Sequence, residues 1–185
     1  MRIQDNSTIK STLTVVGIDP GIANLGIGAI RQEGSKTHLL NCQLIRTHAK
    51  EEASLRLLKI YTEVKSFMQV HKPQALALES QYFHQQKEVA FKVGQAVGVC
   101  LLAAGELNIP VFEYGPLQVK QSLVGTGRAD KTQIMFMVRA LLSLTKPLES
   151  HHVADALALA LTHLSFYKIN SIREEGGRRK EKSEG

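Results

Sequence analysis

Three extended segments precede the first helical pattern of this chain, and this order constrains the fold more than any other feature. Apolar residues run from Leu13 to Ile18 and stop at Asp19-Pro20-Gly21, which is typical of a buried strand that ends in a turn. Two further extended segments, 24–30 and 38–45, are separated by a short polar stretch. Such short connections favour antiparallel pairing, so the chain is predicted to open as a three-stranded meander.

Helical and extended patterns alternate after the meander. Apolar residues recur at helical spacing over 57–68, and the apolar run 75–78 that follows stops at Glu79. A second helical stripe covers 93–107 and leads to a fifth strand at 111–114. Gly94 and Gly98 lie one turn apart in this second stripe, where small residues permit close packing. We therefore expect this helix to be buried against the sheet.

The last third of the chain carries two signals for helix starts. Residues 125–128 form a basic, glycine-rich loop, after which Asp130 can cap a helix and Gln133 can complete a capping box. Ser150 can likewise cap a final helix that runs through Tyr167. The final sixteen residues are polar and highly charged, so we expect them to be disordered.

Together these elements describe an α/β protein with a five-stranded mixed sheet flanked by helices. A chain of 185 residues suits one domain with one sizeable core. We predict a single folded domain over residues 12–168, an N-terminal extension at 1–11 and a disordered tail at 169–185.

Charge and composition limit the possible partners. The net charge is +6, and the stretch 170–185 holds five basic and four acidic residues, so most of the positive excess lies on the folded body. That excess suits a polyanion, since Lys and Arg that neutralise phosphates release counterions, although many basic domains bind no nucleic acid.

The start of the chain lacks an apolar signal core, and no uncharged apolar run reaches the roughly 20 residues that span a membrane. We predict a cytoplasmic protein with no membrane partner, in which Cys42 and Cys100 are small core residues.

Four side chains are candidates for one shared site. Asp19 and Glu79 each follow an apolar strand at the point where the chain leaves the sheet. Asp155 lies in the otherwise apolar helical run 153–161, where an unpaired carboxylate is costly to bury. His152 lies one turn before Asp155 on the same face.

Divalent metal would allow these groups to share one site. Three carboxylates and an imidazole repel and perturb one another unless a cation compensates them, and two-metal sites of this kind cleave phosphodiesters. Hard oxygen ligands favour Mg²⁺. The alternative is a set of ordinary caps and turns, since Asp-Pro-Gly is a common turn whose carboxylate can bond its own backbone. That alternative fits Asp19 well and Asp155 poorly.

An ordered series of motifs resembles the RuvC family of Holliday junction resolvases. The match extends from about Thr14 to about His163, and such an ordered series is far more specific than any one of its parts. The motifs are Val16-Gly-Ile-Asp-Pro-Gly21, Gly26-Ile-Gly28, Leu78-Glu79, Val93-Gly-Gln-Ala-Val-Gly98, Val111-Phe-Glu-Tyr114, Gln118-Val-Lys-Gln121 and Ala154-Asp-Ala-Leu-Ala158. The resemblance implies an RNase H-like fold and a metal-dependent endonuclease of DNA recombination and repair.

The resemblance also implies a mechanism and its residues. A homodimer would resolve a four-way DNA junction by paired symmetric nicks with two Mg²⁺ ions per active site, for which Mn²⁺ could substitute, and RuvA and RuvB would be its branch-migration partners. Carried over by position, Asp19, Glu79 and Asp155 are catalytic metal ligands. The family's fourth ligand is often an aspartate and is His152 here, with His151 directly before it, so either histidine could fill that position. A neutral imidazole can hold a metal or accept a proton from water, which predicts activity that falls near a histidine pKa.

Five residues are candidates for DNA contact. Lys120 and Lys131 match basic positions beside the catalytic cleft of the family, where an ammonium group can stabilise developing charge, so Lys131 is also a catalytic candidate. Arg128 and Lys87 are plausible phosphate contacts, although each also fits a solvated surface charge. Tyr82 takes the position of a junction-wedging aromatic, where stacking on an unpaired base is worth roughly 1 to 3 kcal/mol.

Two other functions stay open on the sequence alone. An actin-like ATPase also opens with a strand and a Gly-Ile-Asp-x-Gly turn, but it needs a second related domain, and this chain has no repeat of the first motif. A catalytically weakened junction-binding protein of the same fold is the closer alternative, because the fourth ligand is altered. Three retained, costly carboxylates favour the enzyme.

Overall fold

A five-stranded mixed sheet lies at the centre of the computed structural model, which describes residues 12–80 and 87–181, with side chains up to residue 167. Strands β1 (Thr12–Asp19), β2 (Asn24–Glu33) and β3 (Lys36–Arg46) form the predicted antiparallel meander. β4 (Ala75–Glu79) pairs parallel to β1, and β5 (Val111–Tyr114) pairs parallel to β4. The strand order β3-β2-β1-β4-β5 confirms the predicted α/β class.

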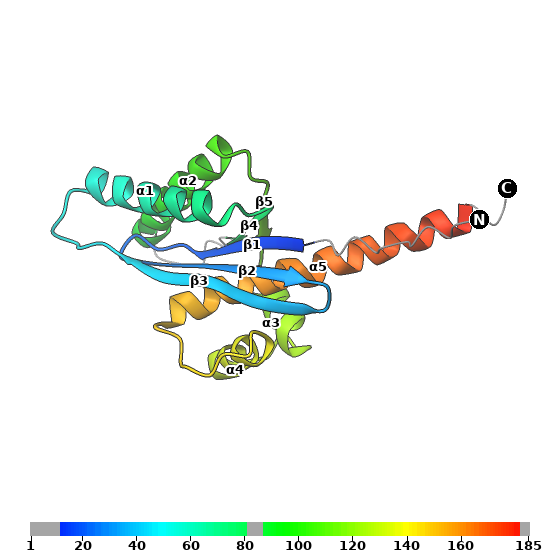
Figure 1. Ribbon diagram of the computed structural model, residues 1–185. Coiled ribbons are helices and arrows are strands. Elements are labelled where there is room, and N and C mark those ends of the chain that lie inside the picture. The colour runs from blue at the N-terminus through cyan, green and yellow to red at the C-terminus, as the bar shows by residue number, and fades with distance from the viewer. Residues whose placement is uncertain (1–11, 81–86, 182–185) are drawn as a thin grey trace.

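Helices cover both faces of this sheet (Figure 1). α1 (Ala53–His71) and α2 (Lys87–Glu106) lie on one face, whereas α3 (Pro116–Val124), α4 (Lys131–Leu141) and α5 (His151–Glu181) lie on the other. Side chains of β1 alternate between the two layers, so that Val16 and Ile18 join the core under α1 and α2 while Val15 joins the core under α5. Because both faces of β1 and β4 are covered, these strands are continuous apolar runs rather than alternating ones.

α3 was not among the predicted elements. It has nine residues, too few to display a helical apolar stripe. Its start signal is local: Pro116 occupies the first turn, and the Gln118 side chain accepts a hydrogen bond of 2.8 Å from the Gly115 backbone N–H. In contrast, the predicted capping box of α4 is present, with the Gln133 N–H donating to Asp130 Oδ1 at 2.8 Å.

The final helix is longer than the sequence predicts. α5 was expected to end near Tyr167 and to be followed by a disordered tail, but its backbone stays helical to Glu181. The added stretch is rich in Arg, Lys and Glu and contains no proline, and these residue types favour a continued helix. The helix leaves the body of the protein in this region (Figure 1).

α2 is more exposed than predicted. Its sheet-facing side consists of small side chains, including Ala96 and Cys100, whereas Gly94 and Gly98 lie on the opposite side with open space around them. The expectation that these glycines pack against the sheet was therefore wrong, because they occupy the other face of the helix. Among the described helices, α2 also has the length and apolar composition of a membrane span, a test that an apolar helix of a water-soluble protein can also pass.

Candidate active site

Asp19 and Glu79 are the last residues of two neighbouring parallel strands. In the register of β1 and β4, Ile18 lies beside Leu78, so the two carboxylates emerge at the same edge of the sheet. This edge is where open α/β sheets collect ligands, because the strands end there and the following loops diverge. The sequence pattern of an apolar run stopped by an acid therefore located two of the four candidate groups.

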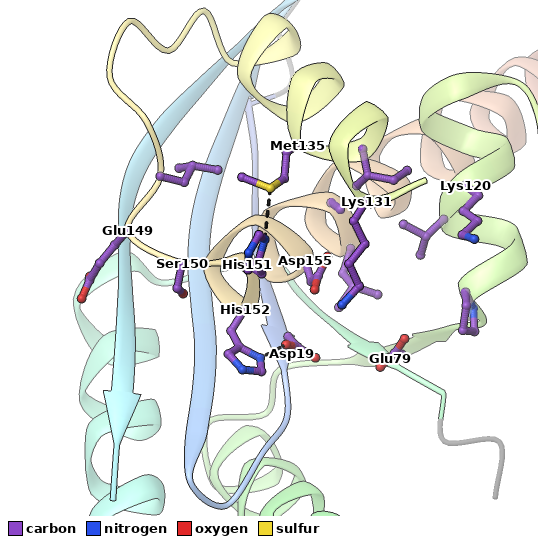
Figure 2. A pocket seen from close by; sticks show the side chains of 16 residues that line it. Asp19, Glu79, Lys120, Lys131, Met135, Glu149, Ser150, His151, His152 and Asp155 are labelled. Atoms are coloured by element: carbon purple, nitrogen blue, oxygen red, sulfur yellow. Dashed lines mark hydrogen bonds and ion pairs between the residues drawn. The ribbon is translucent and has the colours of Figure 1, made fainter. Parts of the chain in front are cut away.

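The first turn of α5 brings the other two groups to this edge (Figure 2). Ser150 caps the helix, since its Oγ accepts a hydrogen bond of 3.2 Å from the Val153 N–H. His152 and Asp155 are three residues apart and project from one face toward the strand ends. The helix start rests directly on β2 at Gly26, where an added Cβ would lie 2.0 Å from the His152 carbonyl oxygen. Only glycine allows this approach.

His152 contacts Asp19 across 133 positions of sequence. Its Nδ1 lies 2.6 Å from Asp19 Oδ2, a short distance that is typical of a charge-assisted hydrogen bond. The Asp19 side chain is 14% exposed and the His152 side chain 44%, so the pair joins a nearly buried acid to a ring that reaches solvent. This contact fixes the relative position of β1 and α5 at the candidate site.

Burial raises the pKa of all three carboxyl groups, and repulsion from neighbouring carboxylates adds to this effect for Asp19 and Glu79. Burial, followed by the charges of Asp19 and Asp155, raises the pKa of Glu79 to about 7. Burial also raises the pKa of Asp19, where Asp155 adds to the effect and the His152 hydrogen bond opposes it. The pKa of Asp155 is raised by burial, against the attraction of Lys131. Clustered carboxyl groups with raised pKa values are typical of a functional site, and a cation bound between them would stabilise their charged forms.

Two of the predicted lysines supply part of that charge. Lys120 on α3 and Lys131 at the start of α4 line the same cavity as the three carboxylates, with a volume of about 730 Å³ (Figure 2). The remaining candidates lie elsewhere. Arg128 is exposed in the loop between α3 and α4, and Lys87 lines a separate shallow hollow on α2. Tyr82 lies outside the described residues.

The two histidines have different surroundings. His151 also lines the cavity, but its Nδ1 faces Met135 Sδ at 3.2 Å, whereas His152 faces Asp19. The geometry therefore favours His152 as the histidine that joins the acidic groups.

Sequence reasoning missed the apolar wall of this cavity. Met135 lies one helical turn after Lys131, a spacing that could have revealed it. Val119 and Leu148 come from α3 and from the loop before α5, and they carry no chemical signal of their own.

The donor set fits hard divalent cations, although it is not gathered around one. Within the described residues, no three His, Cys, Asp or Glu side chains lie close enough together to hold an ion as they stand. Yet three partly buried acids with raised pKa values are the groups that a cation would relieve of repulsion. Metal binding would therefore require these side chains to move toward one another, and oxygen donors would favour Mg²⁺ or Mn²⁺.

Comparison with known proteins gives one consistent result. The family model described as crossover junction endodeoxyribonuclease RuvC matches residues 15–163. The RuvC protein of Thermus thermophilus is 42% identical over 164 residues, which cover 87% of this chain and 99% of that protein. The RuvC protein of Natranaerobius thermophilus is 42% identical over 159 residues, covering 86% and 99% respectively. A solved structure of T. thermophilus RuvC in complex with a Holliday junction substrate matches with a TM-score of 0.82 and 42% identity, over 85% of this chain and 96% of that one.

Proposed function

This chain belongs to the RuvC family of crossover junction endodeoxyribonucleases, and we propose from that membership how its cavity resolves four-way DNA junctions. It is an endonuclease with an RNase H-like fold that acts on Holliday junctions. The observation that carries the mechanism is the meeting of Asp19, Glu79, His152 and Asp155 at one edge of the sheet, beside Lys131.

The four groups form the metal-binding part of the proposed mechanism. Asp19, Glu79 and Asp155 would hold two Mg²⁺ ions, for which Mn²⁺ could substitute, and His152 would supply the fourth ligand. Such ions supply an activated water and a counter-charge for the leaving oxygen. The 2.6 Å contact with Asp19 would hold the His152 ring in place. A nitrogen ligand adds no negative charge, so this site should use Mn²⁺ more readily than a site with four carboxylate ligands would.

The lysines would bind and orient the substrate. The charge of Lys131 opposes the rise in the pKa values of Glu79 and Asp155, so its ammonium group lies within electrostatic reach of both carboxylates. There it can hold the scissile phosphate and stabilise developing charge, with Lys120 on the neighbouring helix as a second phosphate contact. Arg128, Lys87 and Tyr82 are proposed as contacts with more distant parts of the junction, Tyr82 by stacking on an unpaired base.

Paired nicks require two active sites, and we infer a homodimer built on the exposed face of α2. Phe91 is 69% exposed and Leu102 is 57% exposed on this helix, while Gly94 and Gly98 leave room for a close approach. A contiguous apolar surface of this kind is typical of a protein interface. We also propose RuvA and RuvB as partners and the cytoplasm as the location, both from family membership.

The test is cleavage of a synthetic four-way junction, with linear duplexes of the same sequence as controls. With Mg²⁺ or Mn²⁺, the protein should cut opposite strands at symmetric positions and leave the duplexes largely intact. Asp19→Asn, Glu79→Gln and Asp155→Asn should each abolish cutting while junction binding persists, because binding rests on phosphate contacts elsewhere. Equal cutting of junction and duplex would contradict the proposal.

The same assay separates the enzyme from the catalytically weakened junction-binding protein that the sequence alone left open. Such a protein would show the same junction affinity and no cleavage with any divalent metal. A carboxylate variant that stays folded and keeps near-normal turnover at saturating Mg²⁺ would remove that residue from the proposed site.

A further inference from the structure

A nearly buried arginine binds the turn that follows Asp19 and plays no part in the mechanism described above. Arg56, in the first turns of α1, is 9% exposed. None of the ion pairs among the described residues involves its guanidinium group. A buried cation without an acidic partner is costly, and it normally persists only where its hydrogen bonds hold something in place.

The hydrogen bonds of Arg56 hold the turn that follows Asp19. Its Nη2 donates to the Ile22 carbonyl oxygen at 3.2 Å, and its Nε donates to Thr47 Oγ1 at 2.8 Å. The Thr47 hydroxyl donates in turn to the same Ile22 carbonyl, and the Thr47 N–H donates to the Ala23 carbonyl at 3.0 Å. The turn after β1 is thus fastened to the residue after β3 and to the start of α1.

We propose that Arg56 is a positioning residue for Asp19, an inference that rests on the proposed function. Ile22 lies three residues after Asp19, so a turn that is free to move would let the end of β1 and its carboxylate move with it. On the proposed mechanism, Asp19 must meet a cation together with Glu79 at the end of β4 and with His152 and Asp155 at the start of α5. Arg56 restricts this freedom from the α1 side of the sheet, without contact with substrate or metal.

The planar guanidinium group suits this role better than other side chains. It offers two donors in a fixed fork, which reach the two neutral oxygens of Ile22 and Thr47 together. Lysine carries the same charge but has no planar fork, so Arg56→Lys should restore the clamp only in part. A role limited to anchoring α1 would affect stability and leave the metal dependence of cleavage unchanged.

The test compares Arg56→Gln, Arg56→Lys and Thr47→Val in the full-length protein. Thr47→Val removes the shared hydroxyl while keeping the shape of the side chain. The matched control is Arg31→Gln, because Arg31 also donates from Nε to a threonine, Thr14, at the opposite end of β1. Three quantities are measured for each variant: Mn²⁺ affinity by calorimetry without DNA, the Mn²⁺ concentration at half-maximal single-turnover junction cleavage, and junction affinity in EDTA.

Arg56→Gln and Thr47→Val should weaken Mn²⁺ binding and raise the half-maximal Mn²⁺ concentration by about tenfold, since loss of a group that helps to orient a metal ligand typically costs about 10- to 100-fold in metal affinity. Arg56→Lys should give a smaller change in the same direction. Junction affinity in EDTA, and every value for Arg31→Gln, should stay within about twofold of wild type.

A folded Arg56→Gln protein with wild-type Mn²⁺ affinity would overturn the inference, as would equal losses in Arg31→Gln. If Arg56→Gln does not fold, Thr47→Val decides the question in the same way. A wild-type protein that neither binds Mn²⁺ nor cuts junctions would instead refute the proposed function itself, so the two failures are distinct.

Discussion

Replacing Gly26 by alanine should inactivate the enzyme without touching any candidate ligand. The added Cβ would lie 2.0 Å from the His152 carbonyl oxygen, 2.2 Å from its carbonyl carbon and 2.8 Å from the Val153 nitrogen. All three atoms are backbone, so no side chain can rotate out of the way. Contacts below 3.0 Å essentially do not occur for a real Cβ. β2 and the start of α5 must therefore separate by about 1 Å at this point, a displacement that can reduce catalysis about 100-fold.

The assay is single-turnover cleavage of a four-way junction at saturating Mn²⁺, combined with chemical denaturation. Gly26→Ala should lose about 100-fold in rate and about 1 to 3 kcal/mol in the free energy of unfolding, the usual cost of overpacking. Gly28→Ala is the matched control on the same strand, because its new Cβ would meet the end of the flexible Leu157 side chain at 2.5 Å. This control should lose stability but keep most of its cleavage rate. A folded Gly26→Ala protein with wild-type rate, or equal rate losses in both variants, would refute the reasoning.

Three further outcomes are expected. His152→Asp should remain active and use Mg²⁺ better, whereas His152→Ala should be nearly inactive and His151→Ala little changed. Single-turnover cleavage over a range of Mg²⁺ and Mn²⁺ concentrations checks this, and a fully active His152→Ala protein would contradict it. Because the pKa of Glu79 is raised to about 7 in the folded protein, its contribution to the stability of the metal-free protein is present at low pH and is lost as the pH rises through about 7. Glu79→Gln should therefore be more stable than wild type at alkaline pH in EDTA and lose this advantage in acid. Denaturation curves at several pH values measure this difference in stability, and a difference that does not change with pH around 7 would contradict the raised pKa of Glu79. Leu102→Glu on α2 should convert the proposed dimer to monomers in analytical ultracentrifugation. Phe136→Glu, an equally drastic change at a 69% exposed position of α4, should not; a dimeric Leu102→Glu protein would contradict the proposed interface.

The sequence predicted the parts of the site that are encoded locally. An apolar run that stops at an acid indicated Asp19 and Glu79 as candidate ligands, and a carboxylate in an apolar helix indicated Asp155, because each signal needs only neighbouring residues. The fold class followed from the order of the elements for the same reason. The motif resemblance then joined these local signals into one site.

What the sequence could not predict depends on contacts between distant segments. The pairing of His152 with Asp19 spans 133 positions, and no local pattern encodes it. Arg56 occupies a buried helical position where an apolar residue is the usual choice, so nothing in its neighbourhood indicated a clamp on Ile22. The prediction that Gly94 is packed against the sheet was wrong, because helical spacing reveals a stripe of small residues but not which layer of the protein that stripe faces.

The position of α5 has a consequence for how the protein is made. Two of the four candidate metal-site side chains, His152 and Asp155, arrive with the first turn of this helix, which follows every strand of the sheet in chain order. Domains emerge from the ribosome from the N-terminus onward, so a nascent chain can pair β1 with β4 and still lack His152 and Asp155. On the proposed mechanism, nuclease activity would begin only when this last helix docks onto β1 and β2. Truncated chains that end before residue 150 should fold part of the sheet but lack cleavage activity, because they carry only two of the four proposed metal ligands.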